Sequence, residues 1–250
     1  MSQQLDNNDS MTADLSRRRF LGAAAGVAVA PGVILVGVAG AKPADEPASS
    51  AVRWGMLIDT TKCATGCDAC VRACNQENGL EGHGRPATDA QWIRKVELRD
   101  KSTGLQQSLP VMCQHCESPP CVDVCPTGAS FKRVDGIVLV DRHICIGCRY
   151  CMMACPYKAR SFVHEDLENQ KPHAPRGKGC VEACTLCVHR VDAGGQPACV
   201  EACAAEGHAA MVFGDLKDPN SEISQRLRKH ASTQIRADLG LNPCVRYEGI

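Results

Sequence analysis

Eighteen of the 250 residues are cysteines, and sixteen of them fall into four groups of four. Cysteine thiols can form disulfides or ligate metal, so their spacing has to decide between these chemistries. Within a group the thiols are close enough in sequence to face a common centre. The four groups are Cys63, Cys67, Cys70 and Cys74; Cys113, Cys116, Cys121 and Cys125; Cys145, Cys148, Cys151 and Cys155; and Cys184, Cys187, Cys199 and Cys203.

The third group has the most specific spacing. Its C-x2-C-x2-C-x3-C-P run, completed by Pro156, resembles the bacterial ferredoxin signature, in which three thiolates bind one cubane and the fourth binds the other cluster. The proline turns the chain away after the run, so that the last thiol points elsewhere. Together with its three relatives, this run predicts that the sixteen cysteines are the metal ligands of four [4Fe–4S] clusters.

The ferredoxin rule also predicts crossed ligation, because a three-residue spacer and a helical turn carry the fourth thiol away from its own loop. The second and third groups then form an inner pair of clusters, and the first and fourth groups form an outer pair. The expected sets are Cys145, Cys148 and Cys151 with Cys125; Cys113, Cys116 and Cys121 with Cys155; Cys63, Cys67 and Cys70 with Cys203; and Cys184, Cys187 and Cys199 with Cys74.

Two cysteines, Cys180 and Cys244, remain outside the four groups, and we expect neither to be an essential ligand. Cys180 is ambiguous, because its spacing to Cys184 and Cys187 repeats the C-x3-C-x2-C spacing at the start of the first group. A disulfide between the two leftover cysteines remains open at this point.

The N-terminus resembles a twin-arginine (Tat) signal. Residues 16–21 read SRRRFL, and residues 22–41 are apolar, small and without charge, ending in an Ala-Gly-Ala cleavage pattern. We expect a signal peptide over residues 1–41 that is cleaved after Ala41, and a linker over residues 42–52. An uncleaved transmembrane anchor is the open alternative, since about 20 residues can span a bilayer. Because the Tat route carries folded proteins with inserted cofactors, this export route predicts a cofactor-loaded periplasmic protein.

Two other chemistries compete for the same cysteines. A zinc ribbon takes four ligands from two C-x2-C knuckles and does not use a run like the third group. A disulfide scaffold suits an exported protein, but Tat export implies folding in a reducing cytoplasm, where disulfides are disfavoured. Iron and acid-labile sulfide analysis separates these alternatives from iron–sulfur ligation.

Short elements must position the ligands. We expect a strand near residues 53–58, two strands over residues 130–134 and 137–140 joined by a type I′ turn at Asp135-Gly136, and a strand at residues 160–163. Helices are expected over residues 197–205 and 221–231, the latter starting at Ser221 as N-cap. The predicted fold is α+β, with two intertwined ferredoxin-like units that each bind two [4Fe–4S] clusters. The four-cluster domain is expected over residues 53–215, with the inner unit at about 104–165 inserted in the outer one, and a C-terminal extension over residues 216–250.

Composition supports clusters over a conventional core. Aromatic residues make up only 4% of the chain, so metal–ligand bonds are expected to supply stability that a small core cannot. Lys+Arg and Asp+Glu are both 28, and this neutral balance argues against nucleic acid as a partner. No catalytic arrangement of Ser, His, Cys or Asp can be proposed, because the reactive thiols are consumed as metal ligands.

Several polar residues beside the cysteines invite a functional interpretation. His115 and His143 are interpreted as packing or hydrogen-bonding residues that tune a cluster, with a Rieske-type or haem ligand as the alternative. Arg149, Lys158 and Arg160 surround the third group and can offset the negative charge of a cluster, or they are simply solvated surface.

Beyond the cysteines, the chain resembles the four-cluster subunits of bacterial membrane redox complexes such as polysulfide, dimethyl sulfoxide and formate-dependent nitrite reductases. A closer resemblance is to the DsrO family, the periplasmic iron–sulfur subunits of Dsr complexes. It rests on residues 53–59 (RWGMLID), 91–96 (QWIRKV), 112–121 (MCQHCESPPC), 144–160 (ICIGCRYCMMACPYKAR) and 214–223 (GDLKDPNSEI). One departure is the C-x3-C start of the first group, where relatives more often have C-x2-C.

The resemblance implies an electron-transfer subunit rather than an enzyme. Its expected partners are an integral membrane quinone-interacting subunit, a multihaem c-type cytochrome and other Dsr complex subunits, through which it associates with the membrane. The electron-transfer small subunit of a periplasmic molybdopterin oxidoreductase is the alternative.

Overall fold

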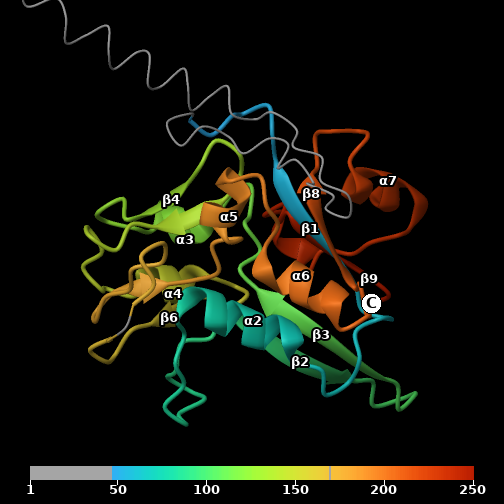
Figure 1. Cartoon of the computed structure of the whole chain (residues 1–250), viewed down its shortest axis with the longest axis horizontal. Coiled ribbons are helices and arrows are strands. Elements are labelled where there is room, and N and C mark those ends of the chain that lie inside the picture. The colour runs from blue at the N-terminus through green and yellow to red at the C-terminus, as the bar shows by residue number, and fades with distance from the viewer. Residues whose placement is uncertain (1–46, 169) are drawn as a thin grey trace, which may run out of the picture. The chain divides into compact units, whose positions relative to one another are not determined.

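A computed structural model describes residues 47–168 and 170–250, and it has an α+β fold of short elements (Figure 1). The signal segment, the transmembrane alternative and residues 42–46 of the linker lie outside the described residues. The strands are β1 (Trp54–Asp59), β2 (Ile93–Arg99), β3 (Gln106–Met112), β4 (Ser130–Lys132), β5 (Val138–Val140), β6 (Ser161–Phe162), β7 (Val181–Glu182), β8 (Met211–Asp215) and β9 (Val245–Glu248). The helices are α2 (Ala69–Asn78), α3 (Pro120–Asp123), α4 (Tyr150–Ala154), α5 (Val188–Asp192), α6 (Ala198–Ala205), α7 (Glu222–Lys229) and the 3₁₀ turn η1 (Ala237–Leu239).

The largest sheet has the strand order β8-β1-β9, with β1 antiparallel to β8 and parallel to β9. The strand expected near residues 53–58 is therefore confirmed as β1, at the centre of this sheet. Successive side chains of a strand point to opposite faces, so Met56 and Ile58 join the main core while Leu57 packs with Val212 and Ile223 on the other face. Both faces of β1 are buried as a result.

Helix α7 covers the Leu57 face of this sheet, as Figure 1 shows beside β8. Its predicted N-cap is confirmed, because the Ser221 hydroxyl accepts a hydrogen bond from the Ser224 amide at 3.2 Å. Such a cap satisfies an amide that would otherwise have no helical partner. The helix ends at Lys229, two residues before the expected end.

The hairpin between the second and third cysteine groups is confirmed, but its turn differs from the expected type I′. β4 and β5 pair antiparallel, with Ser130 opposite Val140. A type I′ turn needs positive φ at both central residues, whereas Gly136 has φ of 90° and Asp135 does not have a positive φ. Asp135 is buried and its carboxylate accepts hydrogen bonds from the Arg133 guanidinium. This ion pair holds a longer loop than the sequence suggested.

A second hairpin, β2–β3, was not anticipated as a pair of strands. Its seven paired positions make it the longest ladder of the described chain. β2 contacts α2, and α2 in turn packs on α6, as the side-by-side helices in Figure 1 show. The predicted strand and helix at residues 160–163 and 197–205 are confirmed in the shorter forms of β6 and α6.

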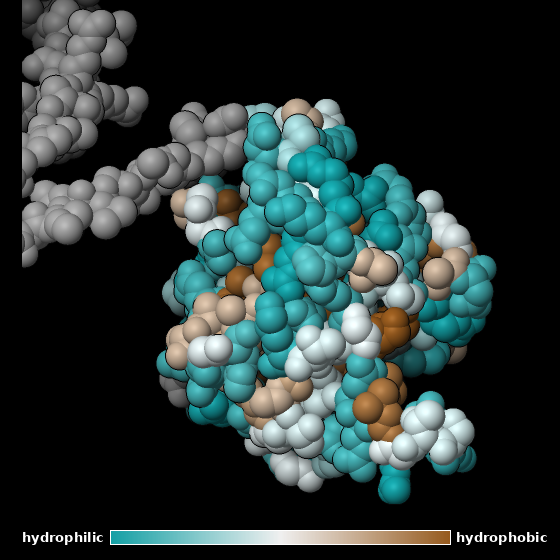
Figure 2. Space-filling view, turned by 90° about the vertical axis from the view of Figure 1, so that its right-hand side faces the viewer, coloured by the Kyte–Doolittle hydropathy of each residue, from teal (hydrophilic) through white to brown (hydrophobic). Residues whose placement is uncertain are grey.

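The apolar core is small and cysteine-rich, as the composition predicts. The main buried cluster combines a few large side chains, notably Trp92 and Tyr247, with cysteines of all four groups. On the face shown in Figure 2, hydrophobic side chains form small patches separated by hydrophilic ones. Among the described residues, no helix combines the length and apolar character needed to cross a membrane.

Candidate metal centres

The first site brings together cysteines that are up to 140 positions apart in the chain. Cys63, Cys67 and Cys70 line a small cavity with Cys203. Three of these thiols come from one run and the fourth comes from the last group. We call this four-cysteine set site 1.

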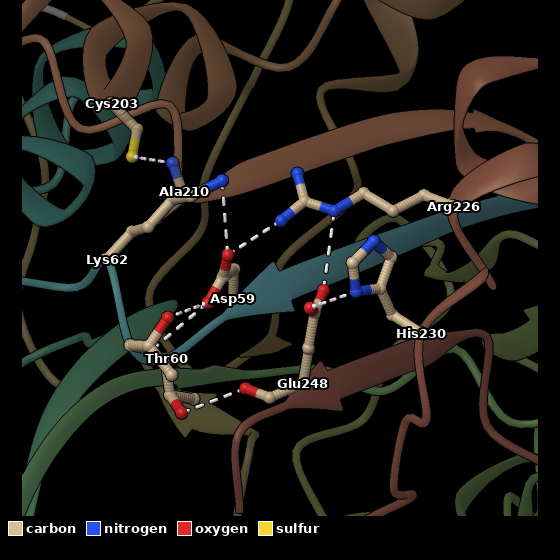
Figure 3. A network of polar contacts seen from close by, with 9 residues as sticks. Asp59, Thr60, Lys62, Cys203, Ala210, Arg226, His230 and Glu248 are labelled. Atoms are coloured by element: carbon tan, nitrogen blue, oxygen red, sulfur yellow. Dashed lines mark hydrogen bonds and ion pairs between the residues drawn. The ribbon is translucent and has the colours of Figure 1, made fainter.

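The end of β1 holds the loop that carries Cys63. Asp59, the last residue of β1, accepts hydrogen bonds from the Thr61 hydroxyl at 2.6 Å and the Arg226 guanidinium at 2.6 Å. Arg226 of α7 also pairs with Glu248 of β9 at 3.3 Å, so that one guanidinium links three elements (Figure 3). Burial raises the pKa of Asp59, but the hydrogen bonds from Thr61 and Lys62 outweigh it and lower the pKa below 3.8. Asp59 therefore stays ionised and fixes the start of the loop at neutral pH.

The second site lies next to the first, on the same two helices. Cys74, Cys184, Cys187 and Cys199 line another cavity, together with Trp92 and Ile93, and form site 2. Helix α2 provides Cys70 to site 1 and Cys74 to site 2, while α6 provides Cys199 to site 2 and Cys203 to site 1. Residues four apart lie on one helix face about 6 Å apart along its axis. A pair of packed helices that run in opposite directions can therefore supply two neighbouring sites.

The second and third groups give two further sets. Burial, followed by the nearby Cys121 and Cys155 thiols, raises the pKa of Cys116 to about 11. Cys113, next to the same two thiols, completes site 3. Burial likewise raises the pKa of Cys151, and the nearby Cys145 and Cys125 thiols act in the same direction. We call these three cysteines site 4 and include Cys148 in it, because Cys148 lies between Cys145 and Cys151 in the same loop. Of the sixteen group cysteines, Cys148 alone is exposed.

Polar groups from the protein donate to the sulfurs. Backbone amides of Ser130, Val181, Leu186 and Ala210 donate to Cys125, Cys145, Cys184 and Cys203, at 3.3 to 3.5 Å. Such donors stabilise thiolates and tune cluster potentials. Two cations add to them: Arg160 donates to the Cys121 sulfur at 3.1 Å, and Lys95 donates to the Cys63 sulfur at 2.8 Å.

Of the three flanking cations, Arg160 lies where the charge-offset role needs it, whereas Arg149 and Lys158 have other contacts. Arg160 is buried against site 3, as the charge-offset interpretation requires. Arg149 instead stacks on the Phe162 ring at 3.8 Å, and Lys158 donates to the Met153 carbonyl. Lys95 was not singled out from the sequence. In the sequence, Lys95 stands out only as part of the 91–96 stretch. Nothing in that stretch shows that β2 passes the first cysteine loop.

His115 is a fully buried hydrogen-bonding residue. Its Nδ1 accepts a hydrogen bond from the Val138 amide at 2.9 Å, and burial lowers the pKa of the ring to about 3. The neutral ring therefore carries its proton on Nε2. His143, in contrast, is exposed.

The two leftover cysteines lie close to two of the sets. Cys180 donates to the Arg142 carbonyl at 3.3 Å and does not line the cavity of site 2, although Cys184 and Cys187 do, but its thiol lies beside that of Cys145 in site 4. The Cys244 thiol lies near that of Cys116 in site 3. Burial raises the pKa of Cys244 to about 12. No disulfide joins any two of the eighteen cysteines, all of which lie in the described part of the chain.

Comparisons with known proteins agree with this chemistry. Residues 105–216 match a family described as a 4Fe-4S dicluster domain. The chain is 44% identical to Hdr-like menaquinol oxidoreductase iron-sulfur subunit 1 of Archaeoglobus fulgidus, over 93% of this chain and 97% of that protein. It is 39% identical to a tetrathionate reductase subunit of Salmonella typhimurium, over 95% of this chain and 89% of that protein. It is also 39% identical to protein NrfC of Escherichia coli, over 91% and 92% of the two chains.

These relatives match nearly the whole chain, and the cysteine sets are the chemical feature that the fold is built around. The chain therefore belongs to the family of [4Fe–4S] electron-transfer subunits of membrane-associated redox complexes, in which it carries electrons and is not itself the catalytic subunit.

Proposed function

We propose that each of the four sites holds one [4Fe–4S] cluster, and that the four clusters form a single electron relay. The observation that carries this proposal is the composition of the sets: each combines three cysteines of one group with a fourth from another, the pattern of two-cluster ferredoxins. Sites 1 and 2 then make up the outer ferredoxin-like unit, and sites 3 and 4 make up the inner one, which is inserted at about residues 104–165. Four thiolate ligands at each site suit a cubane cluster.

Each site has a thiol close to a thiol of the next site, and these pairs of thiols give the relay an order. Site 1 adjoins site 2 through Cys70 and Cys199, whose thiols lie close enough to interact electrostatically. Site 2 adjoins site 3 through Cys184 and Cys113. Site 3 adjoins site 4 through Cys121 and Cys151. Electrons would pass in single steps along the order 1-2-3-4, and the two ends would meet different partners.

Site 4 has the features of a docking end. Its exposed ligand Cys148 is surrounded in sequence by exposed apolar side chains, with Ile146 at 67% and Met153 at 64% of their full exposure. Ile144 and Tyr150 are also about half exposed. Exposed apolar residues that gather around a redox centre favour a protein partner. We propose that this end meets an integral membrane quinone-interacting subunit, in keeping with the menaquinol oxidoreductase relative.

Our proposals for the cell compartment and for the complex rest on the N-terminal segment and on the sequence stretches that resemble known subunits. We propose that residues 1–41 are a Tat signal, that residues 42–52 are a linker to the four-cluster domain of residues 53–215, and that the mature protein works in the periplasm. The domain is followed by residues 216–250, from which β9 joins the β1 sheet. A Dsr-type sulfur-metabolism complex with a multihaem c-type cytochrome is the assembly we favour from the sequence stretches described above.

The alternative complex is a molybdopterin reductase, because the tetrathionate reductase subunit and NrfC also match nearly the whole chain. Purification of the native protein from solubilised membranes distinguishes the two. A Dsr-type complex should yield a quinone-interacting membrane protein and a multihaem cytochrome. A large pterin-binding subunit without a cytochrome would support the alternative.

Crossed ligation is tested by comparing three cysteine variants. Cys125→Ser and Cys148→Ser should remove the same component from a redox-titrated EPR spectrum, because both residues belong to site 4. Cys116→Ser should remove a different component. If the loss in Cys125→Ser matches that in Cys116→Ser, ligation is local and the proposed pairing of ferredoxin-like units fails.

A further inference from the structure

A group of potential metal ligands lies outside the sixteen cysteines. Glu77, His173 and His189 place a carboxylate oxygen and two imidazole nitrogens within 4.8 Å of one another. Glu77 belongs to α2, His189 belongs to α5, and His173 lies in the loop before β7. Residues from distant parts of the chain thus converge, and none of them was singled out from the sequence.

The distances between these atoms suit a single divalent ion. The His189 Nε2 lies 2.7 Å and the His173 Nε2 lies 3.9 Å from Glu77 Oε1. The His173 Nε2 also lies 2.9 Å from the Glu77 backbone carbonyl, a hydrogen bond that the ring must leave to bind an ion. Zinc bonds of about 2.0–2.1 Å in a tetrahedral site put ligand atoms about 3.4 Å apart. Both distances reach that value if the side chains shift by less than about 1 Å. The two imidazoles are already stacked, with ring centroids 4.0 Å apart.

The surroundings support the carboxylate in a ligand position. Arg190 donates to Glu77 Oε2 at 3.3 Å, which leaves Oε1 facing the imidazoles. Ligating carboxylates are commonly held by such a hydrogen bond. Arg190 also pairs with Glu201, so its single positive charge is shared between two carboxylates. The three charged groups together carry a net negative charge, which favours a cation.

The three side chains are partly shielded from solvent, but an ion can still reach them. All three side chains are between 21% and 33% exposed, so the ligand atoms are partly shielded from solvent. Both histidines line a cavity of about 430 Å³, which has room for solvent molecules to complete the coordination. Glu77 lies three residues after Cys74, and His189 lies two residues after Cys187, so the trio borders site 2.

We propose that Glu77, His173 and His189 form a binding site for one divalent ion of the zinc type, separate from the four cysteine sets. Two imidazoles and one carboxylate are the ligand set that borderline ions such as Zn²⁺ prefer, whereas an iron–sulfur cluster takes thiolates. The alternative is a hydrogen-bonded network that joins α2 to α5 without metal. The two can be separated by measuring zinc uptake directly.

The experiment uses the full-length, cluster-loaded protein, treated with a chelator and then titrated with Zn²⁺ under anaerobic conditions. After desalting, we expect one zinc per chain with the iron content unchanged. X-ray absorption at the zinc edge should show nitrogen and oxygen neighbours and no sulfur shell. His173→Ala is the main variant, because this loop residue is not adjacent to any cluster cysteine in sequence, and Glu77→Gln is the second.

Both variants should weaken zinc binding at least tenfold while iron content and the cluster EPR spectrum stay as in the parent protein. His83→Ala is the matched control, since it removes an exposed loop histidine outside the trio and should bind zinc normally. The proposal is overturned if the parent protein takes up no zinc or if His173→Ala binds it equally well. A sulfur shell around the zinc would also overturn it, because the ion would then occupy cysteine ligands.

Discussion

Arg160 provides a direct test of how the protein sets the potential of a cluster. Its side chain is only 6% exposed, and one guanidinium nitrogen donates to the Cys121 sulfur at 3.1 Å. Another guanidinium nitrogen donates to the Ser130 hydroxyl. A fixed positive charge beside a cluster stabilises the reduced form, which carries one more electron. Arg160→Met should therefore lower the midpoint potential of the site 3 cluster, and to a smaller extent that of site 4, whose Cys151 thiol also lies near the guanidinium.

The size of this effect follows from the geometry. With about 6 Å between the guanidinium and the added electron, and an effective dielectric constant of about 20, Coulomb's law gives about 3 kcal/mol. For a one-electron couple this is roughly 120 mV, because about 59 mV corresponds to a tenfold change in the equilibrium constant. Relaxation and water entry into the variant reduce the effect, so we expect a fall of about 50 to 120 mV.

The assay is a redox titration followed by EPR on the cluster-loaded protein. Arg160→Lys keeps the charge and should shift the potential by less than a third as much. Arg149→Met removes an equal charge from an exposed position, where solvent screens it, and should have little effect. Iron content must equal that of the parent protein in all three variants.

One result would refute this reasoning. If Arg160→Met keeps the iron content of the parent protein and the site 3 potential stays unchanged or rises, the guanidinium does not act through its charge. Equal shifts in the Arg160→Met and Arg149→Met variants would show that overall charge matters and that the contact with Cys121 does not.

Two further predictions concern site 1 and the fold as a whole. Lys95→Met should lower the potential of the site 1 cluster, by about half the Arg160 effect because the half-buried ammonium is better screened; a shift in the site 3 component instead would contradict the assignment of Lys95 to Cys63. Removal of iron should abolish the native circular dichroism and the cooperative melt, because the cysteine-rich core depends on metal–ligand bonds; an iron-free protein with both properties intact would show that the core folds without its clusters.

The cysteine chemistry was available from the sequence because it is local. Three ligands of a cluster lie within about ten residues in each of the first three groups, and this short-range spacing limits what a loop can bind. Ser221 is another local signal, since a cap depends on residues only three positions away. The short apolar run at residues 54–58 likewise identified β1, although its neighbours in the sheet could not be inferred.

What the sequence could not supply are contacts between distant segments. Lys95 reaches Cys63 only because the β2–β3 hairpin passes the first loop, and Glu77 meets His173 and His189 only because α2 and α5 lie close together. The turn after β4 is a local exception, since Asp135 does not take the positive φ of a type I′ turn and its carboxylate pairs with Arg133, only two residues before it.

The sequence by itself thus determined the cofactor chemistry and the family of this protein, because ligand type and spacing are encoded within single loops. Tertiary structure alone decided which cations lie against which sulfurs and where a second ligand set converges. These depend on packing between elements that are far apart in the chain, and side-chain positions across such contacts have no signature in local spacing.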